Sequence, residues 1–224
     1  MRRLVKFARC GALCMVSHLD LMRCVQRTLR RAHVPMAYSQ GFNPHPLLSF
    51  GQALGVGLAT RGDYFEITLE QAMPPQALVE AFNAHAPDGL RALCAREMGQ
   101  SEKSPMARVE AAQYCLCAND REKQPQVDRA LTALFACKVY PYLKKTKKGE
   151  REDDLRKKLF TCAVDAHGAH AVTACGNENL PPAELVKAVC ALSQMQTDEV
   201  CCIREELMAR DAVGEYVSLF AWAQ

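Results

Sequence analysis

The chain has 224 residues, of which 49% are hydrophobic and 24% are charged, and its formal net charge is +3 at neutral pH. This length suits one large domain or two domains of roughly 100 residues each. No apolar run approaches the roughly 20 residues that a membrane-spanning helix needs, and the first residues lack the apolar stretch of a secretory signal. Composition therefore argues against a membrane protein with helical spans, and we expect a cytoplasmic protein.

Positive charge is concentrated at two places in the chain. The first 50 residues contain eight Lys and Arg against one acid, Asp20, so they carry +7 while the rest of the chain carries −4. A local excess of positive charge is what binding to a phosphate backbone requires. A solvated helix surface or an acidic protein partner would account for it as well. The second basic cluster consists of Lys144, Lys145, Lys147, Lys148 and Arg151.

An amphipathic helix is predicted to begin directly after Ser17. The Ser17 side chain is placed to accept from the backbone N–H three residues on, and Asp20 stands where the reciprocal carboxylate of a shortened capping box belongs. Asp20 also lies in the first turn, where the helix dipole favours negative charge. Apolar residues then recur at helical spacing on one side, and arginines fall on the other. The helix should end before Pro35, because the residue before a proline avoids the α region. The predicted basic face consists of Arg23, Arg27, Arg30 and Arg31.

A loop with two prolines follows this helix, with the sequence SQGFNPHP from residue 39 to residue 46. Prolines at alternate positions prevent regular structure, and Gly41 permits a φ angle that other residues resist. Such a loop is stiff, so it could hold Gln40, Asn43 and His45 in a fixed array that contacts a ligand. The alternative is a surface turn whose Asn and His make only local hydrogen bonds.

Hydrophobic periodicity and turn residues predict an α+β protein with a repeated order of elements. The order β-α-β-β-α-β, which is typical of ferredoxin-like folds, is expected first over residues 1–100 and again over residues 105–224. A polar linker, residues 99–105, separates the two predicted domains. In the first, we expect strands at 4–9, 47–50, 64–69 and 90–98, and helices from Ser17 and at 76–85. In the second, we expect strands at 107–116, 139–144, 160–164, 171–174, 200–209 and 215–221, and helices at 126–137 and 183–195.

The twelve cysteines do not show the spacing of a metal site. In an intracellular chain of this size, most are expected to be small buried hydrophobic residues rather than disulfides. Cys115 and Cys117 alternate along a predicted strand and should face the same side, but no second pair of ligands follows them. We therefore predict no metal in this chain. No role is assigned to His33, His85, His167 and His170.

The segments SHLDLMR, RTLRRAHVPMAYSQGFNPHPLLSFG and GDYFEITLE resemble the radical SAM-linked family of unknown function. The resemblance is dense from about Val5 to Leu69. It continues more loosely near Lys144 to Leu155 and Ile203 to Leu207. Members of this family are encoded beside, or fused to the C-terminus of, a cobalamin-binding radical SAM protein. The resemblance implies a partner that carries an iron–sulfur cluster, SAM and cobalamin. This chain lacks the three-cysteine cluster motif, so we expect no cofactor in it.

The predicted pair of ferredoxin-like domains also resembles the RAMP-type RNA-processing proteins of CRISPR systems, some of which cut RNA without a metal by means of a histidine. His18, at the start of the first helix, and His45, in the proline loop, are the candidate catalytic residues of that alternative. A histidine pair can share general base and general acid roles near neutral pH. The analogy rests on fold alone. A first-turn histidine is otherwise a structural residue.

The hypothesis favoured by the sequence is an accessory, RNA-binding adaptor of a cobalamin-dependent radical SAM enzyme, plausible in tRNA or ribosomal RNA modification. A metal-independent RNA endonuclease and a pure protein-interaction module are the alternatives. Whether the chain is an enzyme is left open. The residues predicted to bind RNA or the partner are Arg23, Arg27, Arg30, Arg31, Gln40, Asn43, His45, Lys144, Lys145, Lys147 and Lys148.

Overall fold

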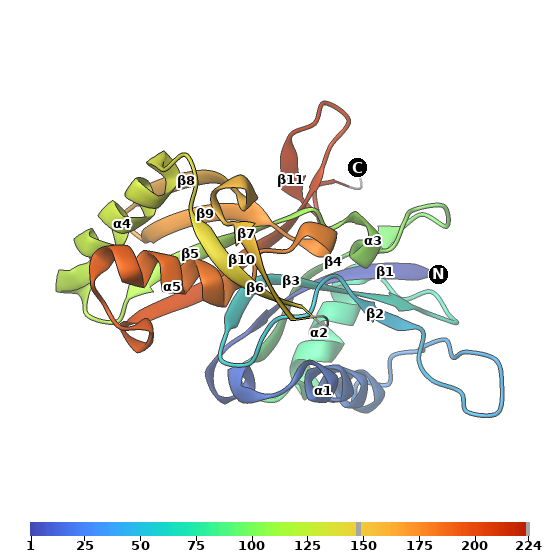
Figure 1. The fold of residues 1–224 in the computed structure, drawn as a ribbon. Coiled ribbons are helices and arrows are strands. Elements are labelled where there is room, and N and C mark those ends of the chain that lie inside the picture. Colours follow the sequence, from blue (N-terminus) through green and yellow to red (C-terminus); the bar gives the residue numbers. More distant parts are fainter. Residues whose placement is uncertain (147–148, 223–224) are drawn as a thin grey trace. The chain divides into compact units, whose positions relative to one another are not determined.

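The structure is a computed structural model that describes residues 1–146 and 149–222. The chain divides into two compact units (Figure 1). Unit 1 consists of Met1–Val109 and Arg204–Gln224, and unit 2 consists of Glu110–Ile203. Among the described residues, each helix is too short or too polar to cross a bilayer.

Unit 1 contains an antiparallel sheet with two helices on one of its faces. β1 pairs with β3 on one side and with β4 on the other, β2 pairs with the far end of β3, and β10 is a further neighbour of β3. α1 and α2 lie on the same side of these strands in Figure 1. The elements, in chain order, are β1 (Arg2–Arg9), α1 (His18–Arg31), β2 (Leu48–Phe50), β3 (Ala59–Thr68), α2 (Pro75–His85), β4 (Leu90–Met98), the short α3 (Pro105–Arg108), β10 (Val200–Arg210) and β11 (Tyr216–Ser218).

The core of unit 1 forms where apolar residues that recur at every second position of the strands pack against apolar residues that recur every three to four positions of the helices. Val5 and Phe7 alternate on β1 and are buried together with Phe65 and Ile67 of β3. The helices close this core with apolar side chains at helical spacing. These are Leu21, Val25 and Leu29 of α1, and Leu78, Val79 and Phe82 of α2.

The segment of residues 204–222 packs with unit 1. β10 begins in unit 2, but from Arg204 onward it belongs to unit 1, where β11 pairs with it. Glu206 accepts from the Lys6 ammonium at 2.6 Å and from the Tyr64 hydroxyl at 2.6 Å. This division differs from the predicted one, which placed everything after residue 105 in a single second domain. Long-range partners of this kind leave no local sequence pattern.

Unit 2 contains a sheet whose middle strands are β5 and β9. β9 lies between β5 and β8, and the beginning of β10 is the other neighbour of β5. α4 and α5 pack against each other, and α4 packs on β5, β8 and β9. A separate hairpin, β6–β7, precedes β8. The elements are β5 (Ala111–Ala118), α4 (Gln124–Ala136), β6 (Pro141–Thr146), β7 (Gly149–Asp154), β8 (Leu159–Asp165), β9 (Gly168–Ala174) and α5 (Pro182–Ser193).

The structure confirms the predicted α+β class, whereas the finer assignment to two tandem ferredoxin-like domains stays a prediction. Most predicted elements are present, with ends that differ by a few residues. Two local differences stand out. The predicted strand at residues 107–116 begins later, because Pro105 opens the short helix α3. β7, with the sequence GEREDD, was not predicted, because it has no apolar residue.

Candidate nucleic-acid interface

The start of α1 has the Ser17 cap that the sequence predicts, without the reciprocal bond from the Asp20 carboxylate to the Ser17 backbone N–H. The Ser17 hydroxyl accepts from the backbone N–H of Asp20 at 3.2 Å, and it also bonds the Asp20 carboxylate at 2.7 Å. The hydrogen bond from Ser17, followed by that from Arg23, lowers the pKa of Asp20 below its ordinary value. Asp20 is therefore a charged capping residue in the first turn, where the helix dipole favours it.

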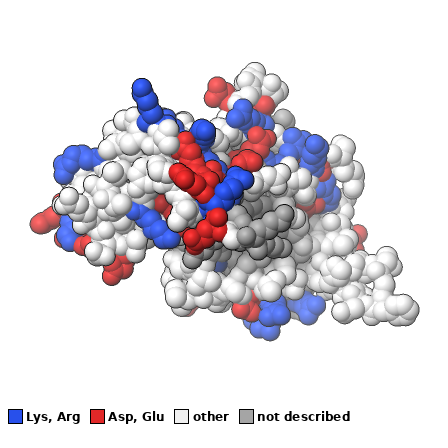
Figure 2. Space-filling view, in the orientation of Figure 1, with Lys and Arg blue, Asp and Glu red and all other residues white. Residues whose placement is uncertain are grey.

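The four arginines of α1 are all exposed. Arg23 bonds Asp20 at 3.1 Å, and both side chains remain more than half exposed. Arg31 donates to the carbonyl of His85 at 3.1 Å. The side chains of Arg27 and Arg30 make no hydrogen bond or ion pair within residues 1–146 and 149–222. Figure 2 shows Lys and Arg side chains gathered over α1 at the lower edge of the view. The arginine face is therefore accessible, and two of its guanidinium groups have no hydrogen-bond or ion-pair partner among the described residues.

The proline loop is exposed and internally braced. The Ser39 hydroxyl accepts from the backbone N–H of His45 at 3.1 Å and also lies 2.9 Å from Nδ1 of its ring, while the N–H of Ser39 donates to the His45 carbonyl at 2.9 Å. Gly41 adopts φ +130°, as its position in the loop predicted. Gln40, Asn43 and His45 are all exposed.

An aromatic side chain that the sequence analysis passed over lies at the tip of this loop. Phe42 is fully exposed. The light blue trace of Figure 1 shows the loop projecting from unit 1 beyond the end of α1. An exposed aromatic ring on a braced loop offers a face on which a nucleobase can stack, a contact worth about 1–3 kcal/mol per base. The pattern Gly-Phe-Asn between polar residues was the available signal.

The second predicted basic cluster is described only in part. Lys144 lies on β6, opposite Arg151 of β7, and is half-buried. Nearby, the buried Lys158 pairs with Asp153, so it serves the structure of unit 2. Lys147 and Lys148 lie outside the described residues, as does the side chain of Lys145.

Arg9, Asp63 and Arg204 form a group of buried ionisable residues in unit 1. Arg9 of β1 is fully buried, and one of its nitrogens, Nη2, donates to the carbonyls of Gly55 at 3.0 Å and Leu58 at 2.8 Å. Its Nε and Nη1 have no hydrogen-bond partner among the described residues. Burial lowers the pKa of Arg9. A bound water or a small anion would satisfy these two nitrogens.

Asp63 of β3 supplies the negative charge of this group. It pairs with Arg204 at 2.9 Å, and both side chains are almost fully buried. Arg204 also donates to the carbonyl of Ala53 at 3.2 Å. The Gly-containing segment of residues 51–58 is therefore held by two buried arginines. The burial of Arg9 and Arg204 was not predicted, because the sequence around a single Arg in a strand does not indicate whether its side chain is buried.

His18 borders this group, whereas His45 does not. The His18 ring is half-buried and meets the edge of Phe50 at 5.4 Å between ring centroids. Burial lowers the pKa of His18, an effect that Asp63 opposes and Arg9 reinforces. His45 lies in the loop beyond the opposite end of α1, which is about 21 Å long. The structure thus does not bring the two candidate catalytic histidines together.

The comparisons with known proteins identify the family. Residues 2–187 match the family described as "Uncharacterized protein conserved in bacteria (DUF2344)", so the chain belongs to this family. This match confirms the coarser part of the prediction, that the chain belongs to a family of unknown function. No curated protein matches the chain.

Two solved structures show weak similarity. One is the "Crystal Structure of an Unknown Protein from Galdieria sulphuraria", with 16% identity, a TM-score of 0.25, and coverage of 91% of this chain and 96% of that one. The other is the "X-ray crystal structure of a heavy metal efflux pump, crystal form II", with 8% identity and a TM-score of 0.25. That match covers 91% of this chain but only 28% of the other protein.

Proposed function

We propose that this protein is a non-catalytic, RNA-binding accessory protein of a cobalamin-dependent radical SAM enzyme that modifies tRNA or ribosomal RNA in the cytoplasm. The observation that carries the RNA part is the exposed arginine face of α1, on which the guanidinium groups of Arg27 and Arg30 have no hydrogen-bond or ion-pair partner among the described residues. Guanidinium groups spaced along a helix suit phosphates, and displacement of condensed counterions drives their binding.

The loop supports the same proposal. Phe42 offers a stacking face, and Gln40, Asn43 and His45 offer polar groups on the same segment. Sequence-specific RNA recognition targets unpaired bases that stack on aromatic side chains and bond through their edges. In this proposal the arginine face holds the backbone, and the loop contacts a base or completes the partner's active site.

The radical SAM partner rests on the resemblance of the SHLD and GFNPHP segments alone. The finer fold assignment belongs to the same proposal. In unit 1, β4-β1-β3 with β2 beside β3, and in unit 2, β10-β5-β9-β8, follow the strand order of a ferredoxin-like fold. Two such domains are the arrangement of RAMP-type RNA-processing proteins, which makes RNA the substrate class to test first.

RNA binding is tested by filter binding of end-labelled total tRNA to the full chain. We expect the affinity to fall steeply between about 50 and about 200 mM salt, because bound cations are released from the RNA. The double variant Arg27→Ala/Arg30→Ala should bind more weakly, with the salt slope reduced by about 1.4 to 1.8 in total, since each lost phosphate contact lowers it by about 0.7 to 0.9.

The matched control is Arg121→Ala/Arg129→Ala, which removes two exposed arginines from unit 2 and the same amount of charge. It should bind like the wild type. Affinity that is independent of salt, or equal losses in the two double variants, would contradict the proposal. Co-purification with the radical SAM protein that survives nuclease, without RNA affinity of this chain, would identify a pure protein-interaction module instead.

A metal-independent RNA endonuclease is the second candidate function. One observation favours it: His18 is half-buried beside Arg9, and its lowered pKa keeps the ring neutral at pH 7, the form that a general base needs. Gel analysis of the RNA recovered from the same titration, carried out in EDTA, separates the two functions. Intact RNA supports the accessory role. Cleavage that His18→Gln abolishes would replace it.

A further inference from the structure

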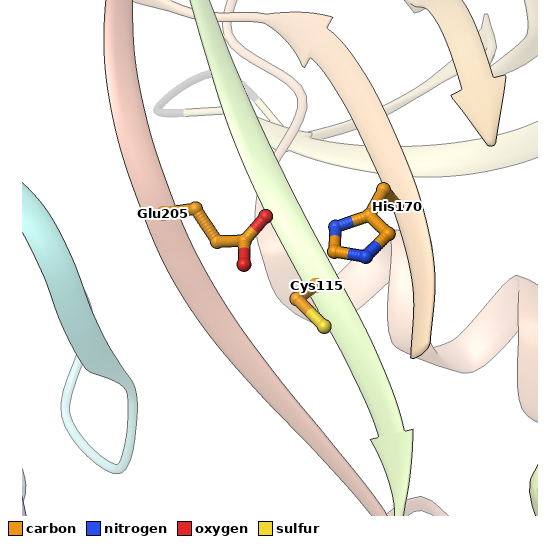
Figure 3. Close-up of side chains that lie close together, drawn as sticks. All are labelled: Cys115, His170 and Glu205. Atoms are coloured by element: carbon orange, nitrogen blue, oxygen red, sulfur yellow. The ribbon is translucent and has the colours of Figure 1, made fainter. Parts of the chain in front are cut away.

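Cys115 and His170 of unit 2 are metal-ligand residue types on neighbouring strands. Figure 3 shows them on β5 and β9, where they are register partners. Glu205, the third side chain in that view, belongs to unit 1. A zinc site uses three or four protein ligands, and the described residues of unit 2 supply no third ligand within 4.8 Å of both. The two residues alone make no metal site, and the predicted absence of a metal stays a prediction.

A small cavity with basic walls lies in unit 1, on the face of the sheet opposite α1 and α2. Leu4 of β1 is the register partner of Arg96 of β4, and both line this cavity. Val5, the next residue of β1, points to the other face and packs in the core under the two helices. Two further cations, Lys103 and Arg108, line the cavity together with apolar side chains and a tryptophan ring.

Arg96 keeps two of its donors without a partner. Its Nη1 donates to the carbonyl of Glu97 at 2.7 Å and lies 3.5 Å from the Glu102 carboxylate. Its Nε and Nη2 are enclosed and have no hydrogen-bond partner among the described residues. These two nitrogens form one edge of the guanidinium, the fork that binds two oxygens of an oxyanion side by side. Burial lowers the pKa of Arg96 more than Glu102 raises it, so the positive charge is only partly compensated.

Arg108 and Lys103 bring two more cations to the same cavity. The Arg108 guanidinium lies over the ring of Trp222, 3.7 Å from its centroid, which is a favourable cation–π contact. The Nε atom of Arg108 is enclosed and has no hydrogen-bond partner within the part of the chain that the structure describes. The Lys103 side chain is exposed. An anion in the cavity would therefore lie among three cationic side chains, with the ammonium group on the solvent side.

Acidic residues do not neutralise these three cations. Glu66, the register partner of Leu4, lies on the same face of the sheet but forms an ion pair with Arg2. Glu206 likewise forms an ion pair with a lysine of β1. The Glu102 carboxylate, 3.5 Å from Arg96, is then the one acid that faces the cavity-lining cations among the described residues. The group keeps an excess of positive charge.

The donors around the cavity favour an anion over a water molecule. Arg, Lys and Trp side chains carry N–H donors and no acceptor, so an enclosed water could not donate its own two hydrogens to them. Phosphate oxygens are strong acceptors and need no such partner. The cavity encloses about 10 Å³, which is room for about one oxygen atom. The rest of a ligand must extend toward solvent, where Lys103 is exposed.

We infer that Arg96, Lys103 and Arg108 bind one phosphate group, which is either a free phosphate ion or a phosphate of a nucleic acid. The Nε–Nη2 fork of Arg96 donates to two of its oxygens, and Nε of Arg108 donates to one of them. The Lys103 ammonium neutralises the part that faces solvent. This site lies on the other face of the sheet from α1, so it does not rest on the proposed RNA interface.

Equilibrium dialysis of radiolabelled inorganic phosphate against the full chain tests this site, with the ionic strength held constant by chloride. We expect one equivalent of phosphate to bind. Arg96→Met should weaken binding by about 10- to 100-fold, the factor that a hydrogen bond to a charged group contributes. Lys103→Gln changes an exposed side chain and leaves the fold intact. It should weaken phosphate binding by a smaller factor, because solvent screens an exposed ammonium group.

Arg91→Gln is the matched control, since it removes the charge of an exposed arginine from the same strand, and it should bind phosphate like the wild type. Arg27→Ala/Arg30→Ala should also bind it like the wild type, so this site and the RNA interface can fail separately. Circular dichroism checks that Arg96→Met keeps the fold.

Unlabelled total tRNA, added at constant ionic strength, identifies the source of the phosphate group. Displacement of the label would show that the cavity takes a phosphate of a nucleic acid, and retention of the label would show that it holds a free phosphate ion. The absence of saturable phosphate binding to the wild type would overturn the inference. Equal phosphate binding by the wild type, Arg96→Met and Lys103→Gln would overturn it as well.

Discussion

His18 shows what burial does to a single residue at the start of α1. Its ring is half-buried against Phe50, and burial, more than any neighbouring charge, lowers its pKa from the ordinary value. The sequence placed His18 correctly in the first turn, because Ser17 and Asp20 mark the helix start. Its environment depends on Arg9 and Asp63, which come from two other elements, so no local pattern could have predicted its protonation state.

The lowered pKa of His18 predicts a pH-dependent contribution to stability. In the unfolded chain His18 takes up a proton near its ordinary pKa of about 6.5, and in the folded chain only at lower pH. Between these two pH values the unfolded chain binds more protons, so acidification destabilises the folded state. The stability of the wild type relative to His18→Gln should therefore fall as the pH is lowered through about 6.5, by less than about 1 kcal/mol because solvent screens a half-exposed ring.

Urea unfolding measures this difference at a series of pH values. Trp222, the only tryptophan, lies in unit 1 with the Arg108 guanidinium 3.7 Å from its ring centroid, so its fluorescence reports the unfolding of that unit. A difference between the two proteins that stays constant from pH 7.5 to pH 5.5, a range of about one unit on either side of the ordinary pKa, would contradict the assigned burial.

At the scale of elements, helices were predicted more successfully than strand partners. α1 has a cap, an apolar stripe and a basic stripe, and α2 and α5 begin with prolines in the first turn, which are strong local signals. The proline loop was likewise recognised as a segment without regular structure. β7 was missed because its six residues are all Gly or charged, and its pairing with β6 comes from the hairpin rather than from burial.

The Asp63–Arg204 pair joins elements that are far apart in the sequence. It connects β3 with β10 and, through the carbonyls of Gln52 and Ala53, with the segment before β3. Both side chains are at most 4% exposed. Removal of one partner of a buried ion pair costs more than the pair itself contributes. Substitutions of Asp63 and Arg204 are therefore expected to have strongly non-additive effects on the free energy of unfolding.

Asp63→Ala should destabilise unit 1 by about 3–5 kcal/mol, because the buried Arg204 guanidinium then loses its ion pair with Asp63. Arg204→Met should also destabilise it, and the double variant should lose less than the sum of the two single losses. Urea unfolding followed by Trp222 fluorescence gives all three values. Arg61→Ala, which removes an exposed arginine 3.9 Å from Glu205, is the control and should change stability by less than about 1 kcal/mol. Additive losses would show that the pair is not coupled in solution.

At the scale of the whole molecule, compact units do not follow the order of the chain. Residues 204–222 return to unit 1 after unit 2 has been completed, and this return was not predicted. One residue, Gly62, does give a local signal of this return. Gly62 lies in the middle of β3, where a glycine weakens a strand unless another backbone approaches closely. The backbone that approaches is that of β10, at Glu205 and Glu206.

Gly62→Ala therefore tests whether the C-terminal segment completes unit 1 in solution. A Cβ at this position would fall on the carbonyl oxygen of Glu205 and lie 2.9 Å from Cα of Glu206, and backbone atoms cannot turn aside as a flexible side chain can. We expect a loss of about 1–3 kcal/mol in urea unfolding, as for other overpacked sites. Gly55→Ala is the matched control, since its Cβ meets only Leu58 Cδ1 at 3.6 Å and its φ is not left-handed, and it should stay within about 0.5 kcal/mol of the wild type. Equal stability of the two variants would mean that β10 does not pack beside β3, and the buried partner of Asp63 would then be lost as well.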